Sequence, residues 1–434
     1  MSDYFEIAYA AASERLCLFT GTGFSKAVTN NRAPSWQQLL EGICDLAPDP
    51  ASLKEALYPG GNLGVLSLEE SAQVIYLELM RAGKSIHDEI ASAIGRIDLE
   101  GDNTAIANFL STKAVKVATT NYDKLVEALA GPGASHSITP GLPIPRSHAK
   151  VEVYHVHGSV DSPGNMVVTS DDYFKFINSE SYFSRKLSTL LHENTVVILG
   201  YSLGDTNLKA ILSNYRGFSR SHSIGSNIFL VSRSAVAQHL KDYYAHCYGI
   251  RVLDRTEVHD FFVSLNATMP AAENRLVNSL ADLQNVIFRG YEFTTNYLRI
   301  ESSFFEIVAS LGAAGLSINH ARVVEMLGRV IRTKIALTQE NGAWNQYPDL
   351  AHWLAYLASI LELEGTSIEG TFLTAVLHSM TTMRREKYIG YSWQAYRSWE
   401  ARWPNVIASN RRIIRAHIEA NTGLADALAV VRSV

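Results

Sequence analysis

The chain has 434 residues and a formal net charge of −5, and 47% of its residues are hydrophobic. This composition excludes a disordered chain, and the charge gives no overall attraction to nucleic acid or to an anionic membrane. Its three scattered cysteines exclude a disulfide framework and a zinc site of paired cysteines, so we expect no metal. No leader pattern and no uncharged apolar run of about 20 residues is visible, which predicts a cytoplasmic protein.

Short β-rich runs alternate with helical patterns up to about residue 255. Several runs are continuously apolar, which is typical of strands that helices cover on both faces. The alternation predicts an α/β fold with a doubly wound, mostly parallel Rossmann-like sheet, and such sheets bind ligands at the carboxyl ends of their strands. The predicted strands are Arg15–Thr20, Val115–Thr119, Val151–Val156, Met166–Thr169, Thr195–Leu199, Asn227–Val231 and Ile250–Leu253.

The segments between and after these strands suggest the domain organisation. Apolar residues at helical spacing in Leu66–Ile97 predict a helical insertion, at about 50–100, that covers the ligand site. Gly131–Lys150 contains four prolines and is interpreted as a long loop. From about Thr256 onward the apolar spacing is helical. We therefore predict an α/β domain at 1–260 and an all-α domain at 261–434.

The first predicted strand ends in Gly21-Thr22-Gly23-Phe24-Ser25. Glycine allows a sharp turn off a strand and lets a phosphate approach the backbone N–H groups of the following helix. The same turn is common in α/β proteins for packing reasons alone, so this segment is compatible with a nucleotide site and with a purely structural turn.

The second strand runs into Thr120-Asn121-Tyr122-Asp123. Asn and Asp before a helix often serve as N-caps. A packed polar run at the carboxyl edge of the sheet also favours a functional role, in which the Asn121 amide binds a ribose hydroxyl or holds a water.

Two histidines lie at the end of the third strand. His157 precedes Gly158 and can present an imidazole to a ligand, and this side chain suits proton transfer near neutral pH. His155 is expected to be a buried, hydrogen-bonded histidine instead.

The strand that ends at Leu199 continues as Gly200-Tyr201-Ser202-Leu203-Gly204. This matches the Gly-x-Ser-x-Gly motif of a hydrolase nucleophile elbow, so an esterase has to be considered. The candidate histidine precedes the serine, however, whereas that hydrolase order is Ser, acid, His. We therefore interpret the segment as a small-residue turn against which a ligand lies.

Taken in order, these segments resemble the sirtuin superfamily, and more narrowly the sirtuin-like NAD-hydrolysing domains of bacterial anti-phage defence systems. The resemblance covers about residues 15–255. The segments that carry it are Gly21-Thr22-Gly23-Phe24-Ser25, Pro34-Ser35-Trp36, Thr120-Asn121-Tyr122-Asp123, His157-Gly158, Thr169-Ser170-Asp171-Asp172-Tyr173 and Gly200-Tyr201-Ser202.

The resemblance assigns roles to residues of this chain. It implies that 1–260 is a sirtuin-like NAD-binding catalytic domain, with Asn121 and Asp123 at the nicotinamide ribose and His157 as the catalytic base. The other implied NAD-binding residues are Gly21, Thr22, Gly23, Ser25 and Thr120, with Gly200 and Ser202 on the adenosine side and Ser232 or Arg233 beside the adenine.

The resemblance also implies a reaction. The four-cysteine zinc ribbon of protein deacylases is absent, which favours hydrolysis of NAD itself to nicotinamide and ADP-ribose, with NAD as substrate and no metal. This activity would deplete NAD in an infected cell, as an abortive-infection effector does. A non-catalytic NAD or ADP-ribose sensor and a zinc-independent ADP-ribosyltransferase or deacylase remain alternatives.

The implied partners follow from the same family. They are further copies of this chain and a HerA-type hexameric ATPase. The chain has no P-loop of its own, so the motor would be a separate polypeptide. The domain at 261–434 would then serve oligomerisation or partner docking.

Overall fold

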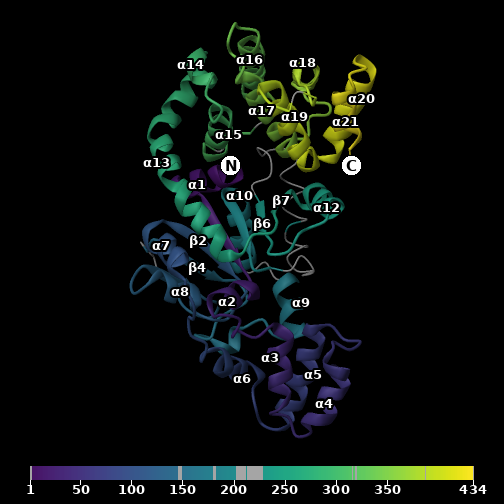
Figure 1. The fold of residues 1–434 in the computed structure, drawn as a ribbon. Helices are drawn as coiled ribbons and strands as arrows, with labels where there is room; N and C mark the ends of the chain where they lie inside the picture. The colour runs from purple at the N-terminus through teal and green to yellow at the C-terminus, as the bar shows by residue number, and fades with distance from the viewer. Residues whose placement is uncertain are drawn as a thin grey trace.

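The structure is a computed structural model that describes residues 2–144, 149–178, 182–201, 212, 228–314, 316–317, 320–386 and 388–433. Within these ranges, helices flank a seven-stranded sheet and a largely helical region follows it (Figure 1). The strands all run parallel, in the order β3-β4-β2-β1-β5-β6-β7, which confirms the predicted sheet. They are β1 (Leu16–Thr20), β2 (Val115–Thr119), β3 (Ser135–Ile138), β4 (Val151–His155), β5 (Thr195–Leu199), β6 (Ile228–Val231) and β7 (Ile250–Leu253).

Successive side chains of a strand point to opposite sides of the sheet. Because consecutive strand residues are apolar here, both faces of the sheet are apolar. In β1, Leu16 and Leu18 enter the core on one face, and Cys17 and Phe19 enter the core on the other. The first face is covered by α1 (Ser2–Ala12), α7 (Thr104–Thr112), α8 (Leu125–Ala130) and α13 (Val258–Phe288). The second is covered by α10 (Tyr182–Glu193) and α12 (Gln238–Tyr248).

The predicted helical insertion between β1 and β2 is present and builds a core of its own. After α2 (Thr22–Val28) it contains α3 (Trp36–Cys44), α4 (Pro50–Leu57), α5 (Leu68–Arg81) and α6 (Ile86–Ile94). Ser35 and Ser67 begin α3 and α5 with capping boxes. Tyr122 and Val168 from the sheet domain belong to the same apolar cluster, so the insertion packs against the carboxyl edge of the sheet.

The C-terminal helices enclose a separate large apolar cluster. They are α14 (Thr295–Leu298), α15 (Ser303–Ala313), α16 (Ala321–Thr338), α17 (Gln346–Ile360), α18 (Glu369–Thr382), α19 (Tyr391–Arg402), α20 (Ala408–Asn421) and α21 (Ala425–Arg432). Helix α13 joins the two regions: Phe261 and Leu265 lie in the sheet core, and Val286 lies in the helical cluster. The predicted boundary at 260/261 falls in its first turn, and the division into domains stays a prediction. None of the described helices has the length and apolarity that crossing a bilayer requires.

Two local predictions are wrong. Met166–Thr169 is not a strand. Met166 and Val168 are buried in the core of the insertion and Val167 in the core on the second face of the sheet, without strand pairing, and the chain then enters α9 (Ser170–Asn178). The segment Gly131–Lys150 is not wholly loop, because it contains the edge strand β3. Ser135, His136 and Ser137 of β3 are half-buried and polar, so no apolar run marked this strand in the sequence.

Candidate functional site

The carboxyl ends of all seven described strands meet at one edge of the sheet, since the strands are parallel. Strand β1 lies between β2 and β5, and the chain crosses from one side of β1 to the other after β4. Such a switch point is where open α/β sheets bind their ligands. The predicted site segments follow β1, β2, β4 and β5, so the topology brings them to this edge.

The turns after β1 and β5 pack directly against each other. Gly200 has φ +66°, and a Cβ there would lie 1.9 Å from the backbone nitrogen of Phe24. The Gly23 N–H donates to the Gly200 carbonyl at 2.8 Å, and the Gly21 N–H donates to the Leu199 carbonyl at 3.1 Å. These two amides therefore hold the turns together, which gives the glycines a packing role. Thr22 is half-buried in the first turn of α2.

A three-residue relay joins the helix after β1 to the segment after β2. The Asn121 Nδ2 donates to Ser25 Oγ at 2.7 Å, and Ser25 Oγ donates to Asp123 Oδ2 at 2.6 Å. Because the serine proton is committed to the carboxylate, Ser25 can only accept from Asn121. The amide oxygen of Asn121 is therefore turned away from Ser25, and no described residue bonds to it.

Asp123 completes this relay from a half-buried position. Its Oδ1 accepts the Leu125 N–H at 3.2 Å, but the N-cap of α8 is Lys124, so neither Asp123 nor Asn121 is an N-cap. Burial raises the pKa of Asp123, although the hydrogen bonds from Ser25 and Leu125 act in the opposite direction. Both carboxylate oxygens of Asp123 accept hydrogen bonds, so Asp123 orients the Ser25 hydroxyl.

Thr120 contacts the turn after β5. Its Oγ1 is hydrogen-bonded to the Tyr201 hydroxyl at 2.9 Å, and the Tyr201 ring packs on Phe19 with ring centroids 5.2 Å apart. These contacts tie the ends of β1, β2 and β5 together.

His157 lies just past β4, in an aromatic enclosure. Its ring makes edge contacts with Tyr173 and Phe176 of α9, with centroids 5.3 and 5.0 Å apart, and the residue is 4% exposed. Burial lowers its pKa to about 4, which leaves the imidazole neutral at physiological pH. Among the described residues, neither ring nitrogen of His157 has a hydrogen-bond partner.

The insertion holds α9, the helix that encloses His157. Gln73 of α5 accepts the Asp171 N–H at 3.2 Å, and His87 of α6 lies 3.1 Å from Asp172 Oδ2. Burial tends to raise the pKa of Asp172, but bonds from His87, Thr169 and the Val168 N–H outweigh it and lower the pKa well below its usual range. The insertion is therefore coupled to His157 through α9.

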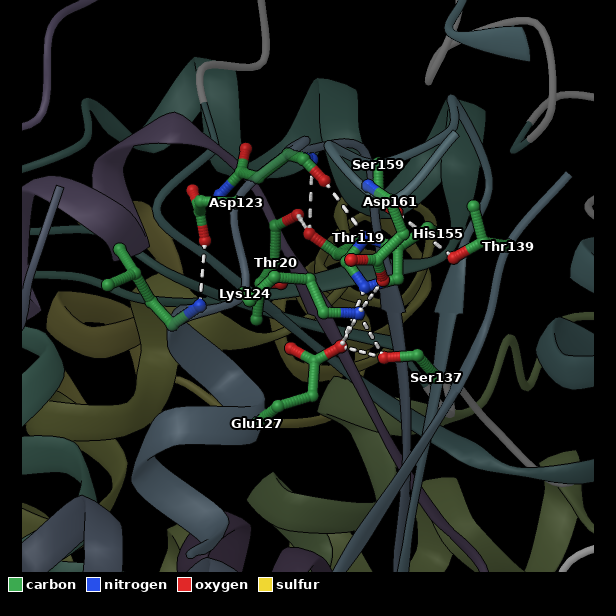
Figure 2. A network of polar contacts seen from close by, with 12 residues as sticks. Thr20, Thr119, Asp123, Lys124, Glu127, Ser137, Thr139, His155, Ser159 and Asp161 are labelled. Carbon is green, nitrogen blue, oxygen red and sulfur yellow. Dashed lines mark hydrogen bonds and ion pairs between the residues drawn. The ribbon is translucent and has the colours of Figure 1, made fainter. Parts of the chain in front are cut away.

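His155 is buried and hydrogen-bonded, as predicted. Its Nε2 lies 2.8 Å from Glu127 Oε1, and its Nδ1 lies 3.2 Å from the Asn121 carbonyl oxygen. Figure 2 shows the surrounding network, in which Lys124 and Ser137 also reach Glu127. Burial would raise the pKa of Glu127, but His155 and Lys124 lower it to about 2.

The remaining predicted residues are less connected. Ser232 follows β6 at the same edge, but its hydroxyl donates to the Ser234 carbonyl at 3.0 Å, and Arg233 is exposed. Ser202 and the rest of the elbow-like segment after Tyr201 lie outside the described residues. No three His, Cys, Asp or Glu side chains in the described ranges are grouped to hold a metal ion.

Several residues of the site were missed from the sequence. Tyr173 and Phe176 carry a usable signal, because aromatic residues three apart on a helix share a face. Glu127 carries none: its partner His155 is 28 positions away, and only the fold brings them together.

Comparison of the sequence with models of protein families indicates a class of domain. The model of the SIR2-like domain family matches residues 115–253, which run from β2 to β7 and include Asn121 and His157. This part of the chain is therefore similar to a SIR2-like domain.

Individual proteins are distantly similar. "Defense-associated sirtuin 2" of Bacillus subtilis is 22% identical over 260 residues, which are 59% of this chain and 24% of that protein. "NAD(+) hydrolase ThsA" of Enterococcus faecium is 35% identical over 111 residues, 24% of this chain and 23% of that protein. The protein of the same name from Bacillus cereus (strain MSX-D12) is 33% identical over 102 residues, 23% of this chain and 21% of that protein. The chain thus spans about a quarter or less of the length of each relative.

Proposed function

We propose that this chain is an NAD+ hydrolase that cleaves the bond between nicotinamide and ribose and acts in defence against phage. The proposal depends on two polar groups that follow the adjacent strands β2 and β4: the Asn121 amide oxygen and the His157 imidazole. Neither group has a hydrogen-bond partner among the described residues. The distant similarity to two NAD+ hydrolases supports the activity, and the similarity to a defence-associated sirtuin supports the role in defence.

The polar groups left over at the sheet edge suit a ribose. Thr20 Oγ1, at the end of β1, is buried and has no hydrogen-bond partner among the described residues, which costs about 1–3 kcal/mol unless a ligand bonds to it. Hydroxyl groups of a ribose both donate and accept, so they match a serine–asparagine relay and a neutral imidazole. The N–H groups of Gly21 and Gly23 already donate to backbone carbonyls, so they do not bind the phosphates of NAD. In this proposal, Thr22 and side chains bind the phosphates instead.

Cleavage of the bond between nicotinamide and ribose requires little acid catalysis from the protein. Nicotinamide leaves as a neutral molecule from a pyridinium, and the transition state at the ribose carbon resembles an oxocarbenium ion. Asn121 would hold the ribose or the attacking water, with Ser25 and Asp123 keeping its amide oriented. His157, neutral because of its burial, would accept a proton from a ribose hydroxyl or from that water.

The test is product analysis with purified protein. Incubation with NAD+ should release nicotinamide and ADP-ribose in equal amounts, and Asn121→Ala and His157→Ala should each lower the rate at least about 100-fold. Asn62→Ala, at an exposed asparagine of the insertion, and His136→Ala, in edge strand β3, are the matched controls. Tight NAD+ binding without product would instead support the sensor, and label transfer onto protein would support a transferase.

Assembly belongs to the same proposal. We infer that copies of this chain associate, and that a hexameric ATPase of the HerA type is the partner. Mass photometry of the chain alone and mixed with such an ATPase tests both points, and nicotinamide release measured in each mixture shows whether assembly controls turnover.

A further inference from the structure

An ion network that runs from the buried His155 to the exposed Asp161 lies next to Asn121. His155 is fully buried at the end of β4, and its ring connects Glu127 on one side to the Asn121 carbonyl on the other. Glu127 is also 2.9 Å from Lys124, whose ammonium donates to Asp161 at 2.7 Å. Figure 2 shows these side chains converging beneath the carboxyl ends of the strands.

Two hydrogen-bond acceptors flank the ring of His155. Both of its ring nitrogens lie against acceptors, a carboxylate oxygen and a carbonyl oxygen. A neutral imidazole has one N–H and satisfies one of these acceptors, whereas an imidazolium satisfies both. Glu127 contacts the ring at Nε2, Lys124 in turn contacts Glu127 and Asp161, and the Asp123 carboxylate interacts electrostatically with His155.

Asn121 is thereby held at three points. Its N–H donates to Thr119 Oγ1 at 3.1 Å, its carbonyl accepts from His155, and its side-chain amide donates to Ser25. Bonds on both sides of the α-carbon restrict the backbone torsions, and the bond to Ser25 restricts the side chain. The amide oxygen is left with one direction in which to meet a ligand.

We propose that His155 and Glu127 are positioning residues: Glu127 orients the His155 ring, and the ring holds the Asn121 peptide so that its side-chain amide is aimed at the ribose. This inference rests on the proposed function, because it assigns the network a role in NAD cleavage. Neither residue touches the substrate, so both act through Asn121.

The kinetic test uses Glu127→Gln and His155→Gln. Displacement of a catalytic group by about 1 Å can cost on the order of 100-fold in rate. We expect kcat for nicotinamide release to fall at least about 10-fold while the KM for NAD+ stays within about 3-fold. His352→Gln is the control, because it removes another histidine–glutamate pair, 2.5 Å from Glu301 in the helical region, and should leave both constants unchanged.

Chemical rescue separates positioning from filling of space. His155→Gly leaves a gap the size of the ring, and added imidazole should restore kcat because its protonated form donates from both nitrogens. Pyrazole has the same ring size but one N–H, so it should not restore the rate. Equal rescue by the two rings, or wild-type kcat in folded Glu127→Gln and His155→Gln, would overturn the proposal.

A measurement without turnover keeps the two proposals apart. If the wild-type chain releases no nicotinamide in any assembly, the proposed function fails, and the positioning is then judged from the Asn121 side-chain amide resonances in asparagine-labelled protein. His155→Gln should shift or broaden them, and His352→Gln should not. Unchanged resonances in His155→Gln would refute the positioning independently.

Discussion

Replacement of Gly200 by alanine tests the contact between the two turns that carry the site. A positive φ of +66° costs alanine about 1–2 kcal/mol. The new methyl would lie 1.9 Å from the Phe24 nitrogen and must displace backbone, at about 1–3 kcal/mol. Displacement also weakens the bond from the Gly23 N–H, worth about 1 kcal/mol. The total is about 3 to 6 kcal/mol.

The matched variant is Gly83→Ala. Gly83 has φ +71° with nothing within 4 Å of its added methyl, so it carries only the conformational cost of about 1–2 kcal/mol. Urea unfolding followed by far-ultraviolet circular dichroism compares the two free energies of unfolding. A Gly200→Ala chain no less stable than Gly83→Ala would refute the close packing of the turns.

Three further predictions concern the site. Ser25→Ala leaves the half-buried Asp123 carboxylate with one donor fewer, so the free energy of unfolding should fall by about 1–3 kcal/mol and kcat for NAD+ should fall; unchanged values for both would contradict the relay. The His157 pKa is about 4 in the folded chain against an ordinary 6.5, so the unfolded chain binds the proton first and stability should fall as the pH drops from about 6.5 to 4. His157→Gln should flatten that part of a pH–stability curve, and an unaltered slope would show that other groups cause it. Asp172→Ala removes the bonds that begin α9, so hydrogen exchange over residues 170–178 should speed up and nicotinamide release should slow; protection equal to wild type would separate α9 from the insertion.

The sequence predicted those parts of the fold that local pattern controls. Val196, Val197 and Ile198 are apolar in succession because helices cover both faces of β5, so this strand was visible. Edge strand β3 has little buried surface and polar residues, and it was missed for that reason. Val168 is buried in the core of the insertion and Val167 in the core on the second face of the sheet, so both are apolar like strand residues although neither is paired in a strand.

The same distinction applies to the site. Asn121 and His157 could be placed at the sheet edge from their positions after strands. The bond that organises Asn121 comes from Ser25, which is 96 positions away, and nothing local predicts such a pairing. The sequence also could not show that the glycine amides are used between the turns, because this depends on where Gly200 lies in three dimensions.

A double-mutant cycle on Asn121 and His157 tests most directly that the two residues act on one bond. The measured quantity is kcat/KM for nicotinamide release in wild type, Asn121→Ala, His157→Ala and the double variant. Residues that act as a unit are strongly non-additive, so the double variant should be little slower than the slower single variant. Fully additive losses, or single variants that match wild type, would contradict a shared role in NAD cleavage.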